Sequence, residues 1–296
     1  MDSSNNEESA QPIIRIFSKG MIKALKSLLI ISFVVIIMEA TSHASTSNLT
    51  DPTVANEELI SLGKWNEKQL DHIIRESAKI HELDKKIDFL SGQFLNVDYK
   101  ESTLIGNIDT PEVFVINLRG VDCFTYVDYI EAMRLSSSFL EFKDKLRTIR
   151  YQSGNINFLN RNHFFTDWEY FNSLYVVDVT EKIGGDETKM VLKTLNDKND
   201  GTYFLPGIPP KKRKIQYIPL DAIDDEMVSK LISGDYIGIY SNQDGLDVSH
   251  VGIIIKEGDK VYFRHASSSK GNRKVVDEDF MNYISDKPGI LILRPK

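Results

Sequence analysis

One cysteine and two histidines supply the side chains that nucleophilic catalysis requires. Cys123 is the single cysteine of the 296-residue chain, while His250 and His265 lie near its C-terminal end. A thiolate attacks carbonyl groups, and a helix N-terminus or a nearby imidazolium favours that thiolate over the thiol. Cys123 directly precedes a periodic apolar segment, residues 124–135. We therefore predict that Cys123 lies at or just before a helix N-terminus.

The two histidines belong to neighbouring apolar runs. His250 opens the segment HVGIIIK, and His265 lies near the end of KVYFRHAS, with the turn residues EGD between the two. Antiparallel strands of this length bring both imidazoles to one end of a sheet, about 5 Å apart across a pair. One histidine would then act as base and the other would orient it. Each of the three residues alone fits a structural role, but together they have the composition of a papain-like site.

The elements that must position these residues can be read along the chain. Apolar residues recur at helical spacing over residues 57–88, broken near Gly63, which predicts two helices. Residues 113–117, 174–180 and 237–240 have the composition of strands. Because helices come first and strands last, we expect an α+β fold.

We expect one catalytic domain over residues 57–296. Its helical N-terminal part is residues 57–95, and residues 140–235 form a large insertion that shapes the substrate cleft. Residues 45–56 are rich in Ser, Thr and Asn and read as a flexible lead-in.

The first 44 residues have the order of a secretory signal. Lysines 19, 23 and 26 precede an 11-residue apolar run, residues 28–38, and small residues follow. That run is shorter than the roughly 20 residues needed to cross a bilayer. We predict cleavage after Ala44 and an exported protein, periplasmic or secreted, with an uncleaved membrane segment and a start at Met21 as alternatives.

Charge and cysteine content exclude some functions. The formal net charge is −7 at pH 7, which argues against nucleic acid as a partner. The basic run KKRK at residues 211–214 is interpreted as a solvated loop. With one cysteine, an internal disulfide is impossible.

The segment RNHFFTDW combines charged and aromatic residues within the predicted insertion. An arginine can bind a carboxylate through two hydrogen bonds, and a tryptophan can stack on a sugar or a peptide plane. We therefore regard four of its residues as candidate substrate-binding groups, with a buried network that anchors the insertion as the alternative. These residues are Arg161, His163, Asp167 and Trp168.

A metal site is the least favoured interpretation. The possible zinc ligands His163, Asp247, His250 and His265 have spacings unlike those of common zinc motifs. We expect neither a metal nor a cofactor.

Three sequence blocks resemble a known family. The strings VDCFTYVDYIEA, DVSHVGIII and FRHASS are similar to the cysteine, histidine and second-histidine blocks of the NlpC-type cell-wall hydrolases, a papain-like family. The resemblance is closest to the branch regarded as N-acetylmuramoyl-L-alanine amidases, which carries further segments matched here by residues 91–95, 149–168 and 245–253. It covers roughly residues 90–295. The long spacing between cysteine and histidine departs from the minimal NlpC-type domain.

The resemblance implies a role for each site residue. Cys123 would be the nucleophile, His250 the base and His265 the orienting third residue. Tyr99 would donate to the oxyanion together with the backbone N–H of Cys123. Three neighbours in the same blocks are further candidates for substrate binding: Asp122, Asp247 and Ser249.

We thus expect a papain-like α+β fold with N-terminal helices, a catalytic helix, a central antiparallel sheet and the insertion. The expected activity is hydrolysis of the amide between N-acetylmuramic acid and L-Ala in peptidoglycan or muropeptides, through a thioester. The alternatives are an endopeptidase that cuts between D-Glu and the diamino acid, an inactive muropeptide-binding protein, and an acyl transferase. We expect a monomer that contacts a membrane only through an uncleaved N-terminal segment.

Overall fold

The structure of the protein is a computed structural model, and it describes residues 58–296. The predicted signal, residues 1–44, and the lead-in, residues 45–56, lie outside the described residues. Residues 58–296 belong to one compact unit. A search of these residues finds no helix with the length and apolar character needed to cross a membrane.

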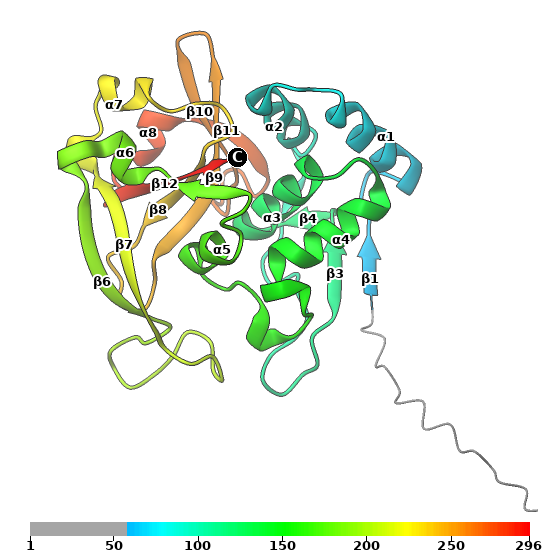
Figure 1. Ribbon diagram of the computed structural model, residues 1–296, viewed down its shortest axis with the longest axis horizontal. Coiled ribbons are helices and arrows are strands. Elements are labelled where there is room, and N and C mark those ends of the chain that lie inside the picture. Colours follow the sequence, from blue (N-terminus) through cyan, green and yellow to red (C-terminus); the bar gives the residue numbers. More distant parts are fainter. Residues whose placement is uncertain (1–57) are drawn as a thin grey trace, which may run out of the picture. The chain divides into compact units, whose positions relative to one another are not determined.

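Two helices follow Gly63, within the segment where apolar periodicity predicts helices. Helix α1 (Glu67–Ala78) begins with a capping box, in which Asn66 Oδ1 accepts from the backbone N–H of Gln69 and Gln69 Oε1 accepts from that of Asn66. Helix α2 (Leu83–Gly92) follows after a short turn. Both helices lie at the outer side of the described chain (Figure 1).

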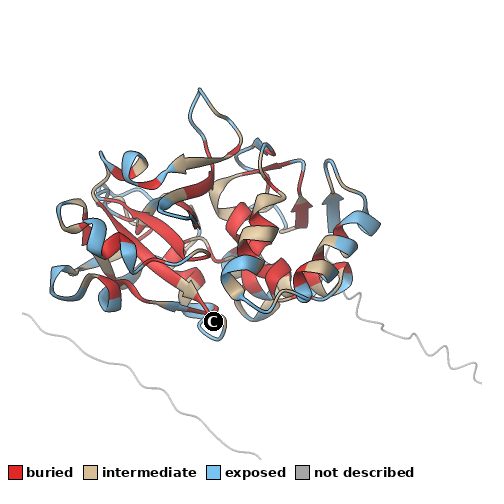
Figure 2. Cartoon of the chain, turned by 90° about the horizontal axis from the view of Figure 1, so that it is seen from above, coloured by how far each residue is buried: buried red, intermediate tan, exposed pale blue. Residues whose placement is uncertain are grey.

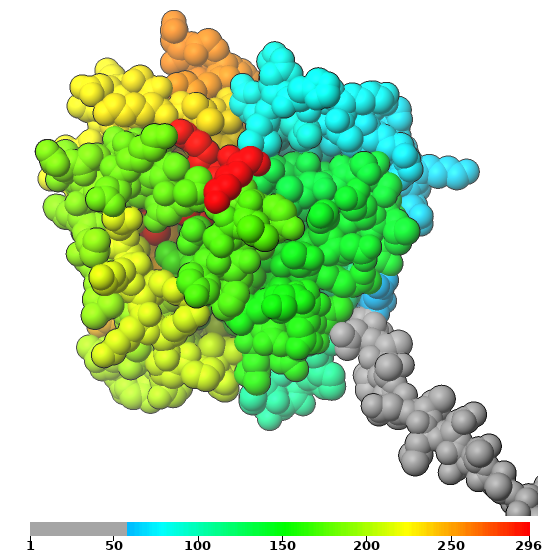
Figure 3. Space-filling model, viewed as in Figure 1, coloured from blue at the N-terminus to red at the C-terminus, as the bar shows by residue number. Residues whose placement is uncertain are grey.

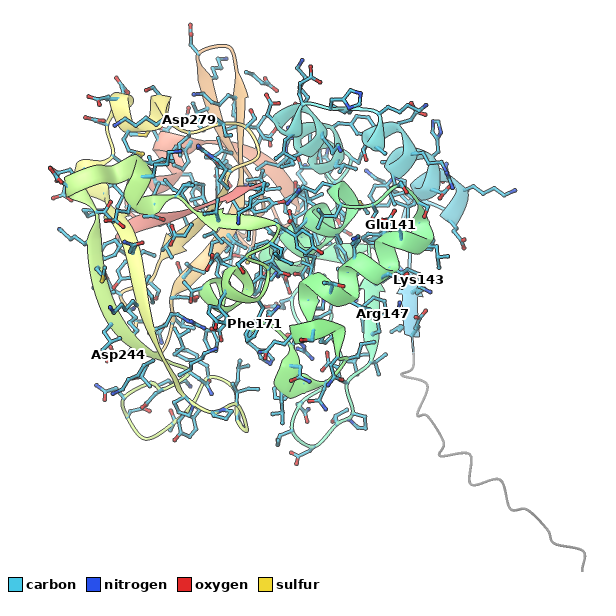
Figure 4. The ribbon with its side chains drawn as sticks, in the orientation of Figure 1. Glu141, Lys143, Arg147, Phe171, Asp244 and Asp279 are labelled. Atoms are coloured by element: carbon cyan, nitrogen blue, oxygen red, sulfur yellow. The ribbon has the colours of Figure 1, made fainter. Side chains whose placement is uncertain are left out.

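The helical prediction was wrong for the residues before Gly63. Glu58–Ser61 form a strand, β1, which pairs in parallel with β3 (Phe114–Asn117). Leu59 is half exposed, so the apolar spacing there does not mark a buried helix face. Lys143 and Arg147 of α4 (Phe139–Arg150) project toward β1 (Figure 4), where both donate to the carboxylate of Glu58.

Helix α3 (Cys123–Arg134) occupies the centre of the molecule. It follows the short strand β4 (Gly120–Val121), which pairs in parallel with β2 (Asp98–Tyr99). Every residue of α3 from Thr125 to Arg134 is buried, because the helix packs against α2, α4 and the strand β9. Such all-round burial is typical of a core helix. The predicted helix start at Cys123 is confirmed.

An antiparallel sheet of eight strands forms the other part of the described chain. Its order is β11-β10-β9-β8-β12-β7-β6, with β5 also paired to β12. The strands are β5 (Val176–Asp178), β6 (Lys189–Leu195), β7 (Lys211–Pro219), β8 (Tyr236–Tyr240), β9 (Val248–Glu257), β10 (Lys260–Ala266), β11 (Val275–Asp279) and β12 (Gly289–Pro295). The remaining α-helices of residues 58–296 are short: α5 (Phe165–Phe171), α6 (Thr180–Gly184), α7 (Asp225–Ser229) and α8 (Phe280–Ile284). The mixed α+β class and the antiparallel sheet are as predicted.

The segment predicted as an insertion is built into this sheet. Residues 140–235 contribute β5, β6 and β7, and β7 pairs with the C-terminal strand β12. The basic run at residues 211–214 opens β7, so its interpretation as a loop was wrong. Its side chains alternate between half-buried and exposed, as they do in a strand that has one face in solvent.

The two faces of the sheet carry different cores. Val251, Ile253 and Ile255 of β9 pack in the cluster that includes α3, whereas Ile254 packs with Phe263 and the residues of α8. Figure 2 shows buried residues concentrated in the sheet and in α3, with exposed residues on the outer helices. The C-terminal residues lie at the surface where the green and yellow parts of the chain meet (Figure 3).

Candidate active site

Cys123 is the first residue of α3, and Asp122 fixes the helix start. Asp122 Oδ1 accepts hydrogen bonds from the backbone N–H groups of Phe124 and Thr125 at 3.1 and 2.7 Å. In return, Thr125 Oγ1 accepts from the backbone N–H of Asp122 at 3.1 Å. This reciprocal capping stops the helix from starting elsewhere. Asp122, a candidate for substrate binding, therefore uses one carboxylate oxygen to hold the cysteine in place.

The cysteine lines a cavity of about 110 Å³. Burial raises the pKa of the Cys123 thiol to about 12, and the carboxylate of Asp122 acts in the same direction. The backbone N–H groups of Val251, Cys123 and Phe124 oppose this shift. We expected the helix N-terminus to favour the thiolate. In this structure, desolvation of the thiolate outweighs the effect of the helix N-terminus, so Cys123 rests as a protonated thiol.

His250 and His265 meet at one end of the sheet, as predicted. The ladder between β9 and β10 ends with Arg264 opposite Ile253, so His265 falls beside Gly252 and diagonal to His250. His250 Nε2 lies 2.7 Å from His265 Nδ1. A side chain at Gly252 would bring its Cβ within 2.8 Å of the Cβ of His265. A glycine between the two histidines is therefore required for their contact.

The environment of the two histidines keeps both neutral. His265 is almost fully buried, with the rings of Phe263 and Tyr283 each 4.8 Å from its own. Burial lowers the pKa of His250 to about 3 and that of His265 to about 4. His265 Nε2 lies 2.9 Å from Oε1 of Glu278 on β11. Because Nε2 of His250 is hydrogen-bonded to His265, Nδ1 of His250 is left for another partner.

Cys123 and His250 share a cavity but make no direct bond in the described residues. The lining residues are Cys123, Phe124, His163, Phe164, Phe165, Leu246, Asp247, Val248, Ser249, His250 and Val251. Hydrogen bonds of catalytic groups are often long or poorly aligned before substrate binds. The arrangement thus places a thiol and a neutral imidazole around one space that is open to a ligand.

The small β2–β4 pair holds Tyr99 beside the segment that leads into Cys123. The Cα partner of Tyr99 in β4 is Val121, two residues before Cys123. Burial raises the pKa of the half-buried Tyr99 phenol, and the charge of a Cys123 thiolate would raise it further. The guanidinium of Arg273 lies 4.7 Å from the ring centroid. A phenol that stays protonated can donate a hydrogen bond to an oxyanion.

Trp168 and Asp167 belong to a buried network, which is the alternative to substrate binding for the segment RNHFFTDW. Trp168 is 0% exposed, and its Nε1 donates to Asp128 Oδ1 at 3.0 Å. It cannot stack on a ligand without opening the core, so its prediction as a binding residue was wrong. Asp167 accepts from Arg213 of β7 and pairs with Lys211 at 3.3 Å, which ties α5 to the β6–β7 hairpin.

Arg161 and His163 lie in different cavities. The guanidinium of Arg161 is paired through two hydrogen bonds with Glu112, at 2.9 and 2.5 Å, and lines a cavity of about 600 Å³ together with Asp122 and Phe158. His163 lines the cavity of Cys123, and its Nε2 lies 2.8 Å from the carbonyl oxygen of Phe158. Burial lowers the pKa of His163 to about 4. Of the four candidates in this segment, His163 is the one that faces the cysteine cavity.

Asp247 and Ser249 precede His250 on the cavity wall. Asp247 is 2% exposed and holds the start of α5, because its Oδ2 accepts from the backbone N–H and the hydroxyl of Thr166 at 2.7 and 2.9 Å. Ser249 is exposed. Within residues 58–296, no group of three or more His, Cys, Asp or Glu residues is placed to hold a metal ion.

The sequence analysis missed Glu278 and Tyr283. Both belong to a region with no distinctive motif, VVDEDFMNYI. Glu278 could only be found from the register of β11 against β10, which pairs it with Phe263. Tyr283 reaches the histidines from α8, a helix of five residues.

Solved structures and a family model match this chain. No curated protein matches the chain in sequence. A protein from Legionella pneumophila has a similar structure, with a TM-score of 0.65 and 24% identity over 77% of this chain and 95% of that one. A crystal structure of an N-acetylmuramoyl-L-alanine amidase from Bacteroides uniformis has a TM-score of 0.58 and 27% identity, over 72% of this chain and 99% of that one.

A second structure of the Bacteroides uniformis amidase gives a TM-score of 0.61 at the same identity. A family model described as AmiA-like, N-acetylmuramoyl-L-alanine amidase-like, matches residues 89–290. That range contains Cys123, His250, His265 and Glu278, and it spans more than half of the chain. The chain therefore belongs to the AmiA-like, N-acetylmuramoyl-L-alanine amidase-like family.

Proposed function

We propose that this protein is a cell-wall cysteine amidase, which hydrolyses the amide bond between N-acetylmuramic acid and L-Ala of peptidoglycan or muropeptides. The observation that carries the proposal is the cavity that Cys123 and His250 share, with Nε2 of His250 hydrogen-bonded to His265. Family membership and the amidase from Bacteroides uniformis supply the substrate. The same arrangement supports the papain-like, NlpC-type assignment of the fold.

The first half of the proposed reaction forms a thioester. His250 Nδ1 takes the proton of the Cys123 thiol as Sγ attacks the lactyl carbonyl carbon of the muramic acid. The carbonyl oxygen becomes an oxyanion, toward which the backbone N–H of Cys123 and the phenol of Tyr99 donate. The imidazolium then protonates the nitrogen of L-Ala, the C–N bond breaks, and the peptide leaves with a free amine.

The second half releases the sugar. His250 takes a proton from a water molecule, whose oxygen attacks the thioester carbonyl carbon. The C–S bond breaks, the sulfur recovers its proton from the imidazolium, and the muramic acid leaves with a free carboxylic acid, which loses its proton to water. Because the resting thiol and imidazole are both neutral, proton transfer accompanies attack in each half, and His250 serves as general base and then as general acid.

Two further features support a bulky substrate. The cavity of about 600 Å³ that contains Arg161 also contains Asp122, the residue next to the nucleophile. It offers polar loop residues such as Ser102 and Asn107 for the hydroxyl and amide groups of a muropeptide.

As peptidoglycan lies outside the cytoplasm, we further propose that residues 1–44 direct export of the protein to the periplasm or beyond it.

The experiment is mass spectrometry of defined muropeptides after incubation with the full-length protein or its Cys123→Ala variant. We expect the wild type to release a free peptide that begins with L-Ala and a sugar with a free lactyl carboxylate. The Cys123→Ala protein should release neither, while keeping the thermal unfolding midpoint of the wild type.

Other products would change the proposal in defined ways. A cut between D-Glu and the diamino acid would replace the amidase by an endopeptidase with the same nucleophile. Equal turnover by Cys123→Ala would overturn the cysteine mechanism. Tight binding of the muropeptide by both proteins without turnover would identify a binding protein.

A further inference from the structure

We propose that Glu278 is a positioning residue, whose carboxylate selects one tautomer of His265 and, through it, one tautomer of His250. The selected form leaves a lone pair on His250 Nδ1, the nitrogen that must accept the thiol proton. The inference rests on the proposed function for its catalytic consequence. The tautomers themselves are a property of the folded protein that can be measured without substrate.

Three adjacent strands each contribute one residue to a continuous row. His250 lies on β9, His265 on β10 and Glu278 on β11. In the β10–β11 ladder, His265 is opposite Val276 and Phe263 is opposite Glu278, so Glu278 stands one diagonal step from His265 on the same face of the sheet. The row joins atoms 2.7 Å apart at its first contact and 2.9 Å apart at its second.

The order of donors along this row follows from the chemistry of its last member. An ionised carboxylate can only accept, so His265 Nε2 carries the proton and donates to Glu278 Oε1. A neutral imidazole has one N–H, which leaves a lone pair on His265 Nδ1. His250 Nε2 must then donate to it, and His250 Nδ1 is left without a proton. In the opposite order, His250 Nδ1 would carry a proton and could not act as a base.

The surroundings of Glu278 are suited to an ionised carboxylate. Its Oε1 also accepts from Asn272 Nδ2 at 3.2 Å, with Ser267 Oγ at 3.4 Å. The side chain is 36% exposed to a cavity of about 440 Å³ behind the histidines. The charged and titratable groups around this row are Cys123, His250, His265, Asp277, Glu278, Tyr283, Asp286 and Lys287.

Glu278 also bears on the charged state of the base. When His250 accepts the thiol proton, it becomes a cation in an apolar setting where burial disfavours charge. The negative charge of Glu278 raises the pKa of His250 against that burial. His265 keeps its proton on Nε2 throughout, so the row stabilises the imidazolium without moving a proton along it. This is the relation between an orienting carboxylate and a catalytic histidine, with one more histidine between them.

The test is ¹⁵N NMR of the histidine side chains in the full-length protein, with three substitutions. Glu278→Leu removes the acceptor, whereas Glu278→Gln keeps an oxygen that can accept but loses the charge. Glu257→Gln makes the same chemical change at an exposed glutamate of β9 and serves as the matched control. Signals of His250 and His265 are assigned by substituting each histidine in turn.

We expect the wild type and Glu257→Gln to carry the proton on Nε2 of both histidines. Glu278→Leu should show both tautomers and a kcat about 100-fold lower with little change in KM, since a misprotonated base cannot take the thiol proton. Glu278→Gln should keep the Nε2–H form and lose less activity, about tenfold.

Two results would overturn the inference. One is a wild-type spectrum with the proton on Nδ1 of either histidine, a result that does not depend on how well any variant folds. The other is a Glu278→Leu protein with unchanged tautomers. If the tautomers respond as expected but no amide is cut by the wild type, the inference stands and the proposed function fails.

Discussion

Two polar networks flank helix α3, one buried and one partly exposed, and they differ in how they end. In the first, the carboxylate of Asp128 binds both Arg150 Nε and Trp168 Nε1, at 2.8 and 3.0 Å, and the guanidinium also donates to the carbonyl of Val115. The second is the row formed by His250, His265 and Glu278. The first network is closed off from solvent in the core, where Arg150 Nη2 has no hydrogen-bond partner among the described residues. The second network opens to a cavity at each end.

This difference separates stability from catalysis. In the closed network, an anion and a cation compensate each other in the core, so the loss of one partner leaves an uncompensated buried charge. In the open row, both histidines are neutral, and His250 Nδ1 has no hydrogen-bond partner within residues 58–296. We expect substitutions in the closed network to change the free energy of unfolding, and substitutions in the row to change the rate.

The largest expected effect is on the rate, at the open row. His250→Ala removes the group that we propose takes the thiol proton, and we expect kcat/KM for muropeptide cleavage to fall by about 10⁴-fold. The free energy of unfolding should change little, because a neutral buried imidazole is lost together with one hydrogen bond. Peptide release followed by chromatography measures the first quantity, and urea denaturation the second. A variant that retains a tenth of the activity would assign the base to another residue.

The next effect is on stability, at the closed network. Asp128→Ala should lower the free energy of unfolding by about 3–5 kcal/mol, since Arg150 stays buried without its carboxylate. Asp144→Ala is the matched control, because Asp144 pairs with Arg147 at the surface, and its loss should cost at most about 1 kcal/mol. Urea midpoints compare the two. Equal midpoints for both variants would show that the closed network does not hold α3 to α4.

A smaller effect lies at the contact between the two histidines. Gly252→Ala would place a Cβ 2.5 Å from the ring of Phe263 and 2.8 Å from the Cβ of His265. We expect about 1–3 kcal/mol of destabilisation from this crowding. Activity should fall as well, because His265 must move away from His250. Gly258→Ala is the control, with positive φ but open space around it. Loss of activity in the control alone would contradict this explanation.

The last effect is the pH dependence of stability. The pKa values of His163, His250 and His265 are lowered to about 4, 3 and 4 by burial. As pH falls below about 6.5, the unfolded chain binds protons that the folded protein does not. Each histidine should then lower the free energy of unfolding by up to about 1.4 kcal/mol per pH unit, until the pH reaches the pKa of that histidine in the folded protein. Urea midpoints from pH 7 to pH 4 test this. Replacing His163 by Phe should flatten the decline, and a midpoint that stays constant with pH would refute the assignment.

The sequence predicts the parts of the site that local pattern determines. Cys123 could be placed at a helix start because an apolar period begins directly after it, and Asp122 with Thr125 supplies the cap. His250 and His265 could be brought together because a tight turn joins their strands. These features depend on neighbours within a few positions along the chain.

The features that were missed depend on register and burial. Glu278 joins the row only through the pairing of β11 with β10. Trp168 was interpreted as a binding residue, yet it is buried against α3, and no local pattern distinguishes the two roles of a tryptophan. The strand at Glu58–Ser61 was read as helix because Leu59 and Leu62 have helical spacing, although it is held by main-chain pairing with β3.

The protonated state of the half-buried Cys123 has a consequence outside catalysis. Oxidants and alkylating agents react with thiolates far faster than with thiols. A catalytic cysteine with a depressed pKa would be exposed to such damage in an oxidising compartment. The thiol of Cys123 becomes nucleophilic only as His250 takes its proton during attack. We therefore expect the resting protein to react slowly with iodoacetamide and peroxide, and its lone cysteine to survive where most thiols form disulfides.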